Sequence, residues 1–259
     1  MGELIAVLSG KGGTGKTSVC AGIASALAYQ GERVLCIDCD IGLRNLDIAL
    51  GLSDEGSLSF LDVCRGDYNL TDAPHHPELE TLQFLTAPMG CAATGIDTES
   101  FFRMLRQAKE QFRYVFLDAP AGIEAGFHLA ARHADRVLLV TGPDPAAVRD
   151  AARAAEVLEL MGKKNIRLIV NRINKKLAAA TKTTVDDIMD RSGLPLMGVV
   201  PEDTEVTLAA VYRTPLILFS RKGAAAKAIP IILLQLSVRK EETKMNCGML
   251  FQSVLVNIR

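Results

Sequence analysis

A glycine-rich segment follows the first apolar run of the chain and decides the fold. It reads Gly10-Lys11-Gly12-Gly13-Thr14-Gly15-Lys16-Thr17-Ser18, directly after Leu4-Ile5-Ala6-Val7-Leu8. The spacing fits G-x-x-x-x-G-K-[ST], the phosphate-binding loop, which lies between a strand and a helix. The apolar run predicts that strand, and residues 17–29 predict that helix. Because a glycine-rich turn that matched by chance would not also have both flanking elements, the sequence predicts a nucleotide-binding protein.

Each part of this segment has a role in holding phosphate. Glycines permit the tight turn that points successive backbone N–H groups at an oxyanion. The following helix adds the positive end of its dipole and its unpaired N–H groups. Lys16 is then expected to reach the β- and γ-phosphates, and the Thr17 hydroxyl is expected to bind Mg²⁺.

The composition of the chain limits the class of protein. Its 259 residues are enough for one large α/β domain, and 49% hydrophobic with 23% charged residues is an ordinary globular balance. A net charge of −1 argues against a protein that coats DNA by charge alone. No apolar run approaches the roughly 20 residues of a spanning helix. We expect no signal peptide, because Met1-Gly2-Glu3 leads straight into the first predicted strand.

The cysteines and histidines give no metal or disulfide pattern. Six cysteines are present, namely Cys20, Cys36, Cys39, Cys64, Cys91 and Cys247. Cys36 and Cys39 have C-x-x-C spacing, but side chains three apart on a strand point to opposite faces, and no second Cys or His pair is near. We therefore predict that both are small core residues. The pair His75-His76 has no acidic or cysteine partner at a ligand spacing, so we interpret it as a loop pair.

Acidic residues follow two of the predicted strands. The strand at 33–38 ends with Asp38, with Asp40 close behind, and the strand at 114–118 ends with Asp118. Ligands of an open parallel sheet bind beyond the carboxyl ends of its strands, so these carboxylates are expected to face the phosphate loop. Asp118 fits the Walker B arrangement, whose carboxylate holds hydrated Mg²⁺. Asp40 is expected to hold Mg²⁺ or to orient the attacking water, and simple solvation of both strand ends is the alternative.

Further apolar runs predict the rest of the sheet. They lie at 82–85, 136–140, 166–172 and 195–200, and they alternate with helical patterns that include 97–113 and 145–161. Strands alternating with helices predict an α/β fold with a doubly wound, mainly parallel sheet flanked by helices. Asp97 or Thr98 is expected to cap the first of these two helices, and Asp144 is expected to cap the second. Residues 51–81 show little pattern beyond a short helix at 57–64.

The phosphate loop resembles that of a known family. Lysine at position 11, within Lys11-Gly12-Gly13-Thr14-Gly15-Lys16-Thr17, is similar to the deviant Walker A loop of the MinD/ParA ATPases. The run Asp38-Cys39-Asp40-Ile41-Gly42-Leu43-Arg44-Asn45-Leu46-Asp47 resembles switch I of that family, and Ala119-Pro120-Ala121-Gly122-Ile123-Glu124 resembles switch II. The resemblance covers about residues 2–230. It implies a P-loop NTPase of the SIMIBI type, with ATP and Mg²⁺ as cofactors.

The same resemblance implies roles for individual residues. Lys11 reaches the nucleotide of a second subunit, so that ATP joins a homodimer; a solvated lysine that attracts any anion is the alternative. Asp40 positions water and metal, Asn45 lies near the phosphates, Gly122 senses the γ-phosphate, and Asn171 contacts the base. The expected adenine pocket also includes Pro201, Glu202 and Asp203, although an ordinary acidic turn explains these three almost as well. The expected catalytic set is Lys11, Lys16, Asp40, Asn45 and Asp118, and the expected Mg²⁺ ligands are Thr17, Asp40 and Asp118.

The end of the chain differs in character from the rest. We expect an ATPase domain over 1–238, whose last helix should kink or restart at Pro230, and a charged hinge with an amphipathic tail over 239–259. Tails of this kind in the family lie in the membrane interface, and two on one dimer gain avidity. This tail has only Arg259 beyond Lys244, so its attraction to anionic lipid should be small. A tail docked on the protein itself is the alternative.

The resemblance implies an ATP-hydrolysing dimerisation switch at the inner membrane surface that takes part in placing the division septum. It implies a cytoplasmic, peripherally membrane-bound protein with a MinC-like inhibitor, a MinE-like activator and no sequence-specific nucleic acid as partners. A ParA-like DNA-segregation ATPase is one alternative, which the near-neutral charge and the apolar tail disfavour. A regulator of flagellar number would share both loop and tail. A cluster-carrying iron protein needs a cysteine after the strand that ends at Asp118, and the sequence has none between Asp118 and Cys247.

Overall fold

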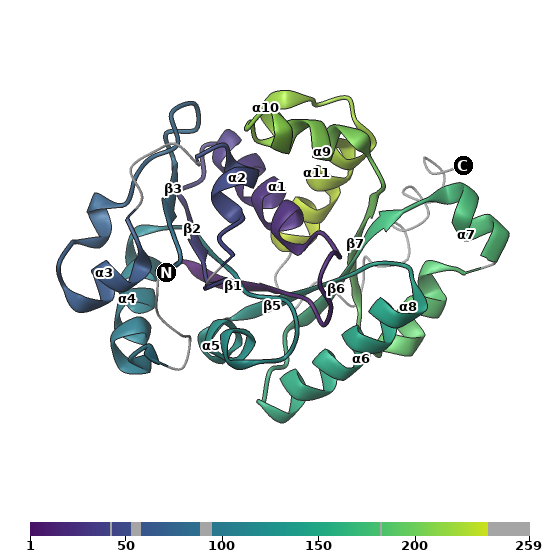
Figure 1. Ribbon diagram of the computed structural model, residues 1–259, viewed down its shortest axis with the longest axis horizontal. Helices are drawn as coiled ribbons and strands as arrows, with labels where there is room; N and C mark the ends of the chain where they lie inside the picture. The colour runs from purple at the N-terminus through teal and green to yellow at the C-terminus, as the bar shows by residue number, and fades with distance from the viewer. Residues whose placement is uncertain (42, 53–57, 89–94, 182, 238–259) are drawn as a thin grey trace.

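Seven parallel strands form the centre of the molecule (Figure 1). The structure, a computed structural model, describes residues 1–41, 43–52, 58–88, 95–181 and 183–237. The strands are β1 (Glu3–Leu8), β2 (Val34–Asp38), β3 (Leu82–Leu85), β4 (Tyr114–Asp118), β5 (Arg136–Thr141), β6 (Ile166–Ile173) and β7 (Leu196–Pro201). They lie in the order β3-β2-β4-β1-β5-β6-β7, and each neighbouring pair is parallel. The predicted doubly wound parallel sheet is confirmed.

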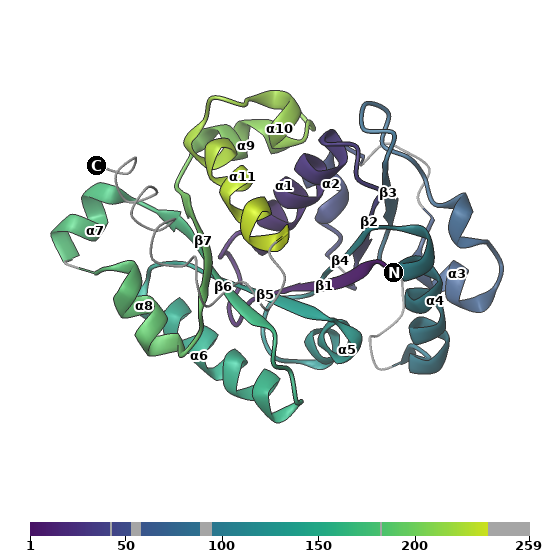
Figure 2. The same cartoon turned by 180° about the vertical axis from the view of Figure 1, so that it is seen from behind.

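Helices cover both faces of this sheet (Figures 1 and 2). One face carries α1 (Lys16–Tyr29), α2 (Leu46–Leu50), α9 (Thr204–Val211), α10 (Leu216–Phe219) and α11 (Ala224–Ser237). The other carries α3 (Phe60–Arg65), α4 (Thr98–Gln111), α5 (Ala125–His133), α6 (Pro145–Leu160) and α8 (Val185–Ser192). Two further elements are the 3₁₀ turn η1 (Leu70–Asp72) and α7 (Lys175–Thr181), which follows β6.

The strands are mainly apolar because both faces of the sheet are covered. In β1, residues 4–8 are all at most 2% exposed. Alternate side chains of this strand belong to different cores: Leu4 packs on the side of α4 to α6, and Ile5 packs on the side of α1. The sheet thus has two cores, and most of its polar residues lie at or near the strand ends.

Cys36 and Cys39 lie fully buried on opposite faces of the sheet, as predicted. Burial raises the pKa of both thiols, so they remain neutral core groups. The imidazole of His76 is also buried, with its Nε2 3.0 Å from the carbonyl oxygen of Leu50, while its Nδ1 accepts two backbone N–H groups. These contacts fix the loop before β3. In the described residues, no three His, Cys, Asp or Glu side chains are grouped to hold a metal ion.

Several helix ends follow the predicted caps. Asp97 accepts two backbone N–H groups of α4, Asp144 accepts one backbone N–H of α6, and Pro145 is the first residue of α6. The short helix predicted at 57–64 begins later, at Phe60, because Ser59 and its partner three residues on form a capping box. The helix does not restart at Pro230, since α11 continues through this residue, and the alternative of a kink there stays a prediction. Buried side chains on both sides of the proline hold the helix against the core.

Some predictions lie outside the described residues. They concern the predicted tail at 239–259, which includes Cys247, the last domain residue Val238, and Cys91. Among the helices that the structure does describe, none has the length and apolar character needed to cross a membrane.

Candidate nucleotide-binding site

The glycine-rich loop joins the carboxyl end of β1 to the start of α1. Gly15 is the N-cap of α1 with a left-handed backbone (φ 82°, ψ 24°), which glycine adopts without steric cost. No described side chain caps this helix, so the N–H groups of its first turn are open to an anion. At the other end of the loop, a Cβ atom on Gly10 would collide with the carbonyl oxygen of Asp150 in α6. The loop therefore needs glycine at both ends.

Three predicted residues form a hydrogen-bonded cluster at the loop, of which Lys16 and Asp118 are buried and Thr17 is partly buried. Lys16 Nζ donates to Asp118 Oδ1 at 2.6 Å, and the Thr17 hydroxyl donates to Asp118 Oδ2 at 2.7 Å. The side chains of Lys16 and Asp118 are only 7% and 1% exposed. Burial raises the pKa of the Asp118 carboxyl, although the Lys16 ammonium and the Thr17 hydroxyl act in the opposite direction. Each charge therefore depends on the other for compensation.

The Asp118 carboxylate and the Thr17 hydroxyl fit Mg²⁺. Mg²⁺ prefers oxygen ligands, and it usually takes one or two from the protein and the rest from water and substrate phosphates. These two oxygen groups lie side by side directly beneath the loop. Both are oxygen groups of the kind that Mg²⁺ binds, so their chemistry fits the predicted Mg²⁺ ligands.

Asp38, the last residue of β2, and Asp40 just after it differ in environment. Asp38 is 1% exposed and accepts the backbone N–H groups of Asp40 and Leu46 at 2.8 and 3.2 Å. Burial first, and then the charge of Asp118, raises the pKa of Asp38 to about 7. Asp38 therefore shapes the segment that follows β2, while Asp40 is less buried. Asn45 is exposed as the N-cap residue of α2, and its contact with phosphate stays a prediction.

Gly122 lies after β4 and contacts the segment before the loop. Its backbone N–H donates to the carbonyl oxygen of Ser9 at 3.0 Å.

Two hydroxyl groups at the loop have no hydrogen-bond partner among the described residues. They belong to Ser9 and Thr14, and both are buried. Buried polar groups are normally paired, so unpaired hydroxyls beside an anion-binding loop favour a ligand or water at this place.

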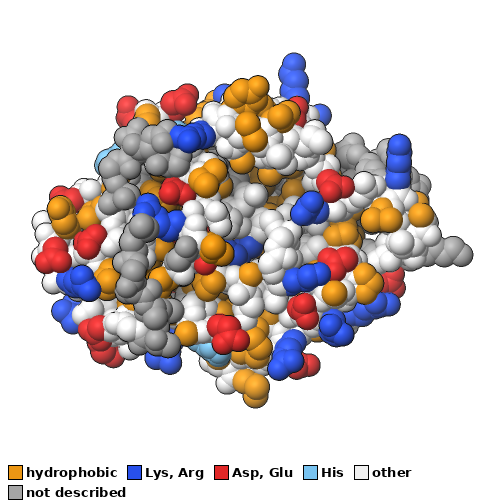
Figure 3. Space-filling model, viewed as in Figure 1, with side chains coloured by type: hydrophobic (Ala, Val, Ile, Leu, Met, Phe, Trp, Pro, Cys, Tyr) orange, Lys and Arg blue, Asp and Glu red, His pale blue; other side chains and the backbone are white. Residues whose placement is uncertain are grey.

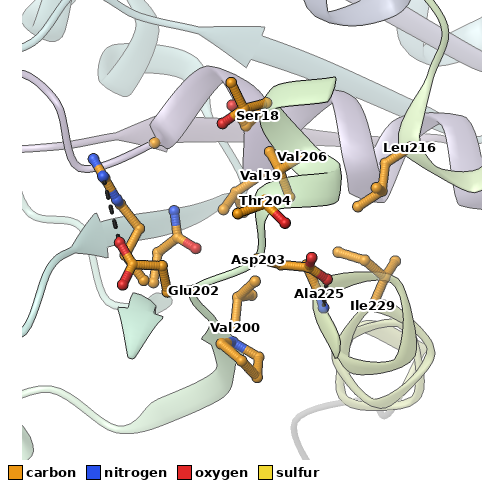
Figure 4. Close-up of a pocket in the computed structure, with 15 residues that line it drawn as sticks. Ser18, Val19, Val200, Glu202, Asp203, Thr204, Val206, Leu216, Ala225 and Ile229 are labelled. Atoms are coloured by element: carbon orange, nitrogen blue, oxygen red, sulfur yellow. Dashed lines mark hydrogen bonds and ion pairs between the residues drawn. The ribbon is translucent and has the colours of Figure 1, made fainter. Parts of the chain in front are cut away.

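A cavity of about 490 Å³ adjoins the loop (Figure 4). It brings together five residues predicted for nucleotide binding beyond the loop core, namely Ser18, Asn171, Pro201, Glu202 and Asp203. Its apolar wall comes from Val19, Val200, Val206, Leu216 and Ile229. Apolar walls with a few polar groups suit a flat heteroaromatic base. The position next to Gly15 lets one ligand occupy both the cavity and the loop.

The polar residues of this cavity also have structural partners. Asn171 Nδ2 donates to the carbonyl oxygen of Thr14 at 2.8 Å, which ties the end of β6 to the phosphate loop. Asp203 accepts the N–H groups of Glu205 and Ala225, so it joins the starts of α9 and α11. The acidic turn at Asp203 therefore has a structural role as well as a place in the cavity wall.

Two charged contacts at the site were not predicted. Lys11 Nζ lies 3.2 Å from Asp144 Oδ1 of the same chain, where the sequence indicated only a helix cap for Asp144. Arg172 Nη1 donates to the carbonyl oxygen of Gly13 at 3.1 Å. The sequence carries no local signal for either contact, because both join segments more than 130 residues apart.

Comparison with known proteins agrees with this geometry. Residues 5–216 match the family model of the CobQ/CobB/MinD/ParA nucleotide-binding domain. The chain belongs to this family. The resemblance of its phosphate loop and switches to MinD/ParA proteins is thereby confirmed, and the chain is an ATPase of the MinD/ParA type.

Individual members of the family are similar over most of their length. A septum site-determining protein MinD from Synechocystis sp. is 37% identical over 220 residues, which are 84% of this chain and 83% of that protein. The structure of the MinC:MinD cell division complex from Aquifex aeolicus matches with a TM-score of 0.83 and 34% identity, covering 92% of this chain and 97% of the other. MinD from Pyrococcus horikoshii, complexed with Mg-ADP, matches with a TM-score of 0.77 and 26% identity, covering 92% and 96%.

Proposed function

We propose that this chain is an ATP-driven dimerisation switch that binds the inner face of the cell membrane and takes part in placing the division septum. The observation that carries the proposal is the different placement of the two loop lysines. Lys16 is buried against Asp118, whereas Lys11 is 43% exposed on the rim of the loop. Lys16 can therefore serve the nucleotide of its own subunit, and Lys11 can extend to a second copy. Its similarity to a septum site-determining protein supports the cellular role.

Within one subunit, the residues of this chain prepare ATP for hydrolysis. Lys16 turns from Asp118 to the β- and γ-phosphates, and the loop N–H groups hold the same oxygens. The Gly122 N–H leaves Ser9 for the γ-phosphate, and Asp40 orients the attacking water. Thr17 and Asp118 would hold Mg²⁺, and the ion would supply positive charge that offsets the charge of the phosphates. Lys11 of the second copy adds positive charge near the γ-phosphate.

The proposed partners follow from the relatives. The Aquifex aeolicus MinD structure contains MinC. We extend a MinC-type inhibitor to this chain by similarity, and we add a MinE-type activator that triggers hydrolysis. The proposed location is the cytoplasm, with peripheral attachment to the membrane through residues 245–259 when ATP pairs two subunits.

Sedimentation with liposomes tests the membrane part of this proposal. The full chain and a version ending at Lys244 are mixed with anionic liposomes in ATP or ADP. We expect the full chain to pellet in ATP but not in ADP, and the shortened version to stay in the supernatant. Equal pelleting of the two versions in ATP would remove the membrane role. A Lys16→Ala variant serves as a control for the need for nucleotide.

Two further assays separate the cellular alternatives. On the face in Figure 3, Lys and Arg side chains are interspersed with Asp and Glu, an arrangement that does not favour a DNA-coating surface. We therefore expect no salt-dependent retention of DNA in ATP. Cells depleted of the chain should divide at wrong positions and keep their number of flagella. Altered flagellar number with normal septa would instead favour a flagellar regulator.

A further inference from the structure

Two consecutive side chains at the end of β6 reach the phosphate loop. Successive residues of a regular strand point to opposite faces of the sheet. Asn171 Nδ2 nevertheless donates to Thr14 O at 2.8 Å, and Arg172 Nη1 donates to Gly13 O at 3.1 Å. The pairing of β6 with β7 shifts its register at this point, and the backbone of Arg172 is left-handed with φ 59°. This irregularity allows both side chains to meet the same loop.

The conformation of Arg172 is held by contacts on two sides. A left-handed backbone is sterically unfavourable for a residue with a Cβ atom, and it persists where surrounding contacts fix it. Besides the carbonyl group of Gly13, the guanidinium lies 3.6 Å from Glu202 Oε1. Glu202 in turn accepts a hydrogen bond from Asn174 Nδ2 at 3.1 Å. The guanidinium thus lies between the loop and the end of β7.

Arg172 also separates two hollows of the surface. It lines the cavity of about 490 Å³ that contains Asn171 and Glu202. It lines a second cavity as well, of about 280 Å³, next to Lys11 and Asp144. The phosphate loop between these cavities is therefore supported from the side of β6.

The hydrogen bonds from Asn171 and Arg172 fix the orientation of two peptide groups of the loop. The C=O and N–H groups of a trans peptide point in opposite directions. Holding the carbonyl group of Gly13 toward Arg172 therefore turns the N–H of Thr14 away from Arg172. Holding the carbonyl group of Thr14 toward Asn171 likewise turns the N–H of Gly15 away from Asn171. These N–H groups belong to the loop that binds phosphate.

We propose that Arg172 is a positioning residue of the phosphate site. Together with Asn171, it holds two successive carbonyl groups outward, so that the N–H groups of Thr14 and Gly15 face the anion. The ligand class is the polyphosphate of a nucleotide, whichever base the nucleotide carries. The inference rests on the nucleotide site of the family and is independent of the proposed role at the septum.

Binding of inorganic pyrophosphate and of ATP, both with Mg²⁺, tests this role by calorimetry on the full chain. Loss of one hydrogen bond from a charged donor should weaken pyrophosphate binding roughly tenfold in Arg172→Ala. Arg172→Lys should lose less, because an ammonium group can still donate to the carbonyl of Gly13. Glu202→Gln should have an intermediate effect, since it removes the charge that holds the guanidinium. Arg167→Ala, at the other end of β6, is the matched control and should bind as the parent does.

Amide hydrogen exchange distinguishes positioning from a general loss of structure. In the parent, pyrophosphate should slow exchange at the N–H groups of Thr14 and Gly15, and in Arg172→Ala this slowing should be lost while β1 stays protected. The inference is overturned if Arg172→Ala binds pyrophosphate as tightly as the parent, if it loses only ATP, or if Arg167→Ala is equally weakened. A parent chain that binds neither ligand would overturn the nucleotide site itself and this inference with it.

Discussion

Lys11 Nζ lies 3.2 Å from Asp144 Oδ1, so the lysine at the rim of the phosphate loop is paired with the residue that caps α6. The two side chains are 43% and 53% exposed. Exposed ion pairs are worth about 0–1 kcal/mol, since water screens them. Lys11 is therefore paired with Asp144 in this structure, and separating the two side chains costs little free energy.

Lys11→Ala should abolish pairing of two subunits in ATP and reduce hydrolysis at least about tenfold, because the variant lacks the charge that acts on the partner's phosphates. Light scattering after gel filtration and phosphate release measure the two effects. Lys176→Ala, on an exposed part of α7, is the matched control and should behave as the parent. A Lys11→Ala variant that still pairs and turns over ATP would leave a monomeric hydrolase.

Removing Asp118 alone should destabilise the nucleotide-free protein by about 3–5 kcal/mol, because the buried Lys16 ammonium loses its partner. Asp118→Ala and Lys16→Met, combined in one chain, should be destabilised by clearly less than the sum of the single changes. Urea unfolding without nucleotide measures all four proteins. Strict additivity would show that the two charges do not depend on each other.

Gly15→Ala should destabilise the chain and abolish ATP binding, because a Cβ atom would meet the Asn171 side chain and the backbone is left-handed. Gly31→Ala is a matched comparison, since Gly31 has φ 88° with no atom near the added Cβ. Its backbone strain should cost about 1 kcal/mol. Thermal unfolding and ATP titration compare the two. Normal ATP binding by Gly15→Ala would contradict the close approach of Asn171.

The stability supplied by Asp144 should depend on pH in the acidic range. The Ala147 N–H, and then Lys11, hold the pKa of Asp144 below its usual value of 3.8. A carboxyl whose pKa is lower in the folded state stabilises the fold above its unfolded pKa, and this contribution is lost as pH falls through the folded pKa. Asp144→Asn keeps a capping side chain but has no charge.

The difference in unfolding free energy between the parent and Asp144→Asn should therefore shrink as pH falls below 3.8. Urea unfolding at a series of pH values measures it. The difference should be small even at neutral pH, since Asp144 is half exposed. A difference that grows toward acid pH would mean that the folded state raises the pKa of Asp144 instead of lowering it.

The parts of the site that could be predicted from sequence are those with local patterns. The loop motif placed Lys16 and Thr17, and an apolar strand with an acid at its tip placed Asp118, because strand ends of a parallel sheet share one edge. Arg172 could not be predicted, since its direction depends on a register shift between β6 and β7. The contact of Lys11 with Asp144 depends on how α6 packs beside the loop.

The hydrogen bond from the Gly122 N–H to the Ser9 carbonyl affects which ligands could bind this N–H group. A ligand that recruits the amide must first break a bond worth about 1 kcal/mol, and it leaves the end of β1 with an unpaired acceptor. A weak or neutral ligand gains too little to do so, whereas a charged oxygen, whose hydrogen bonds are roughly twice as strong, gains enough. A response that runs through this amide would therefore have a threshold, and the hydrogen bond to Ser9 would re-form once the charged ligand departs.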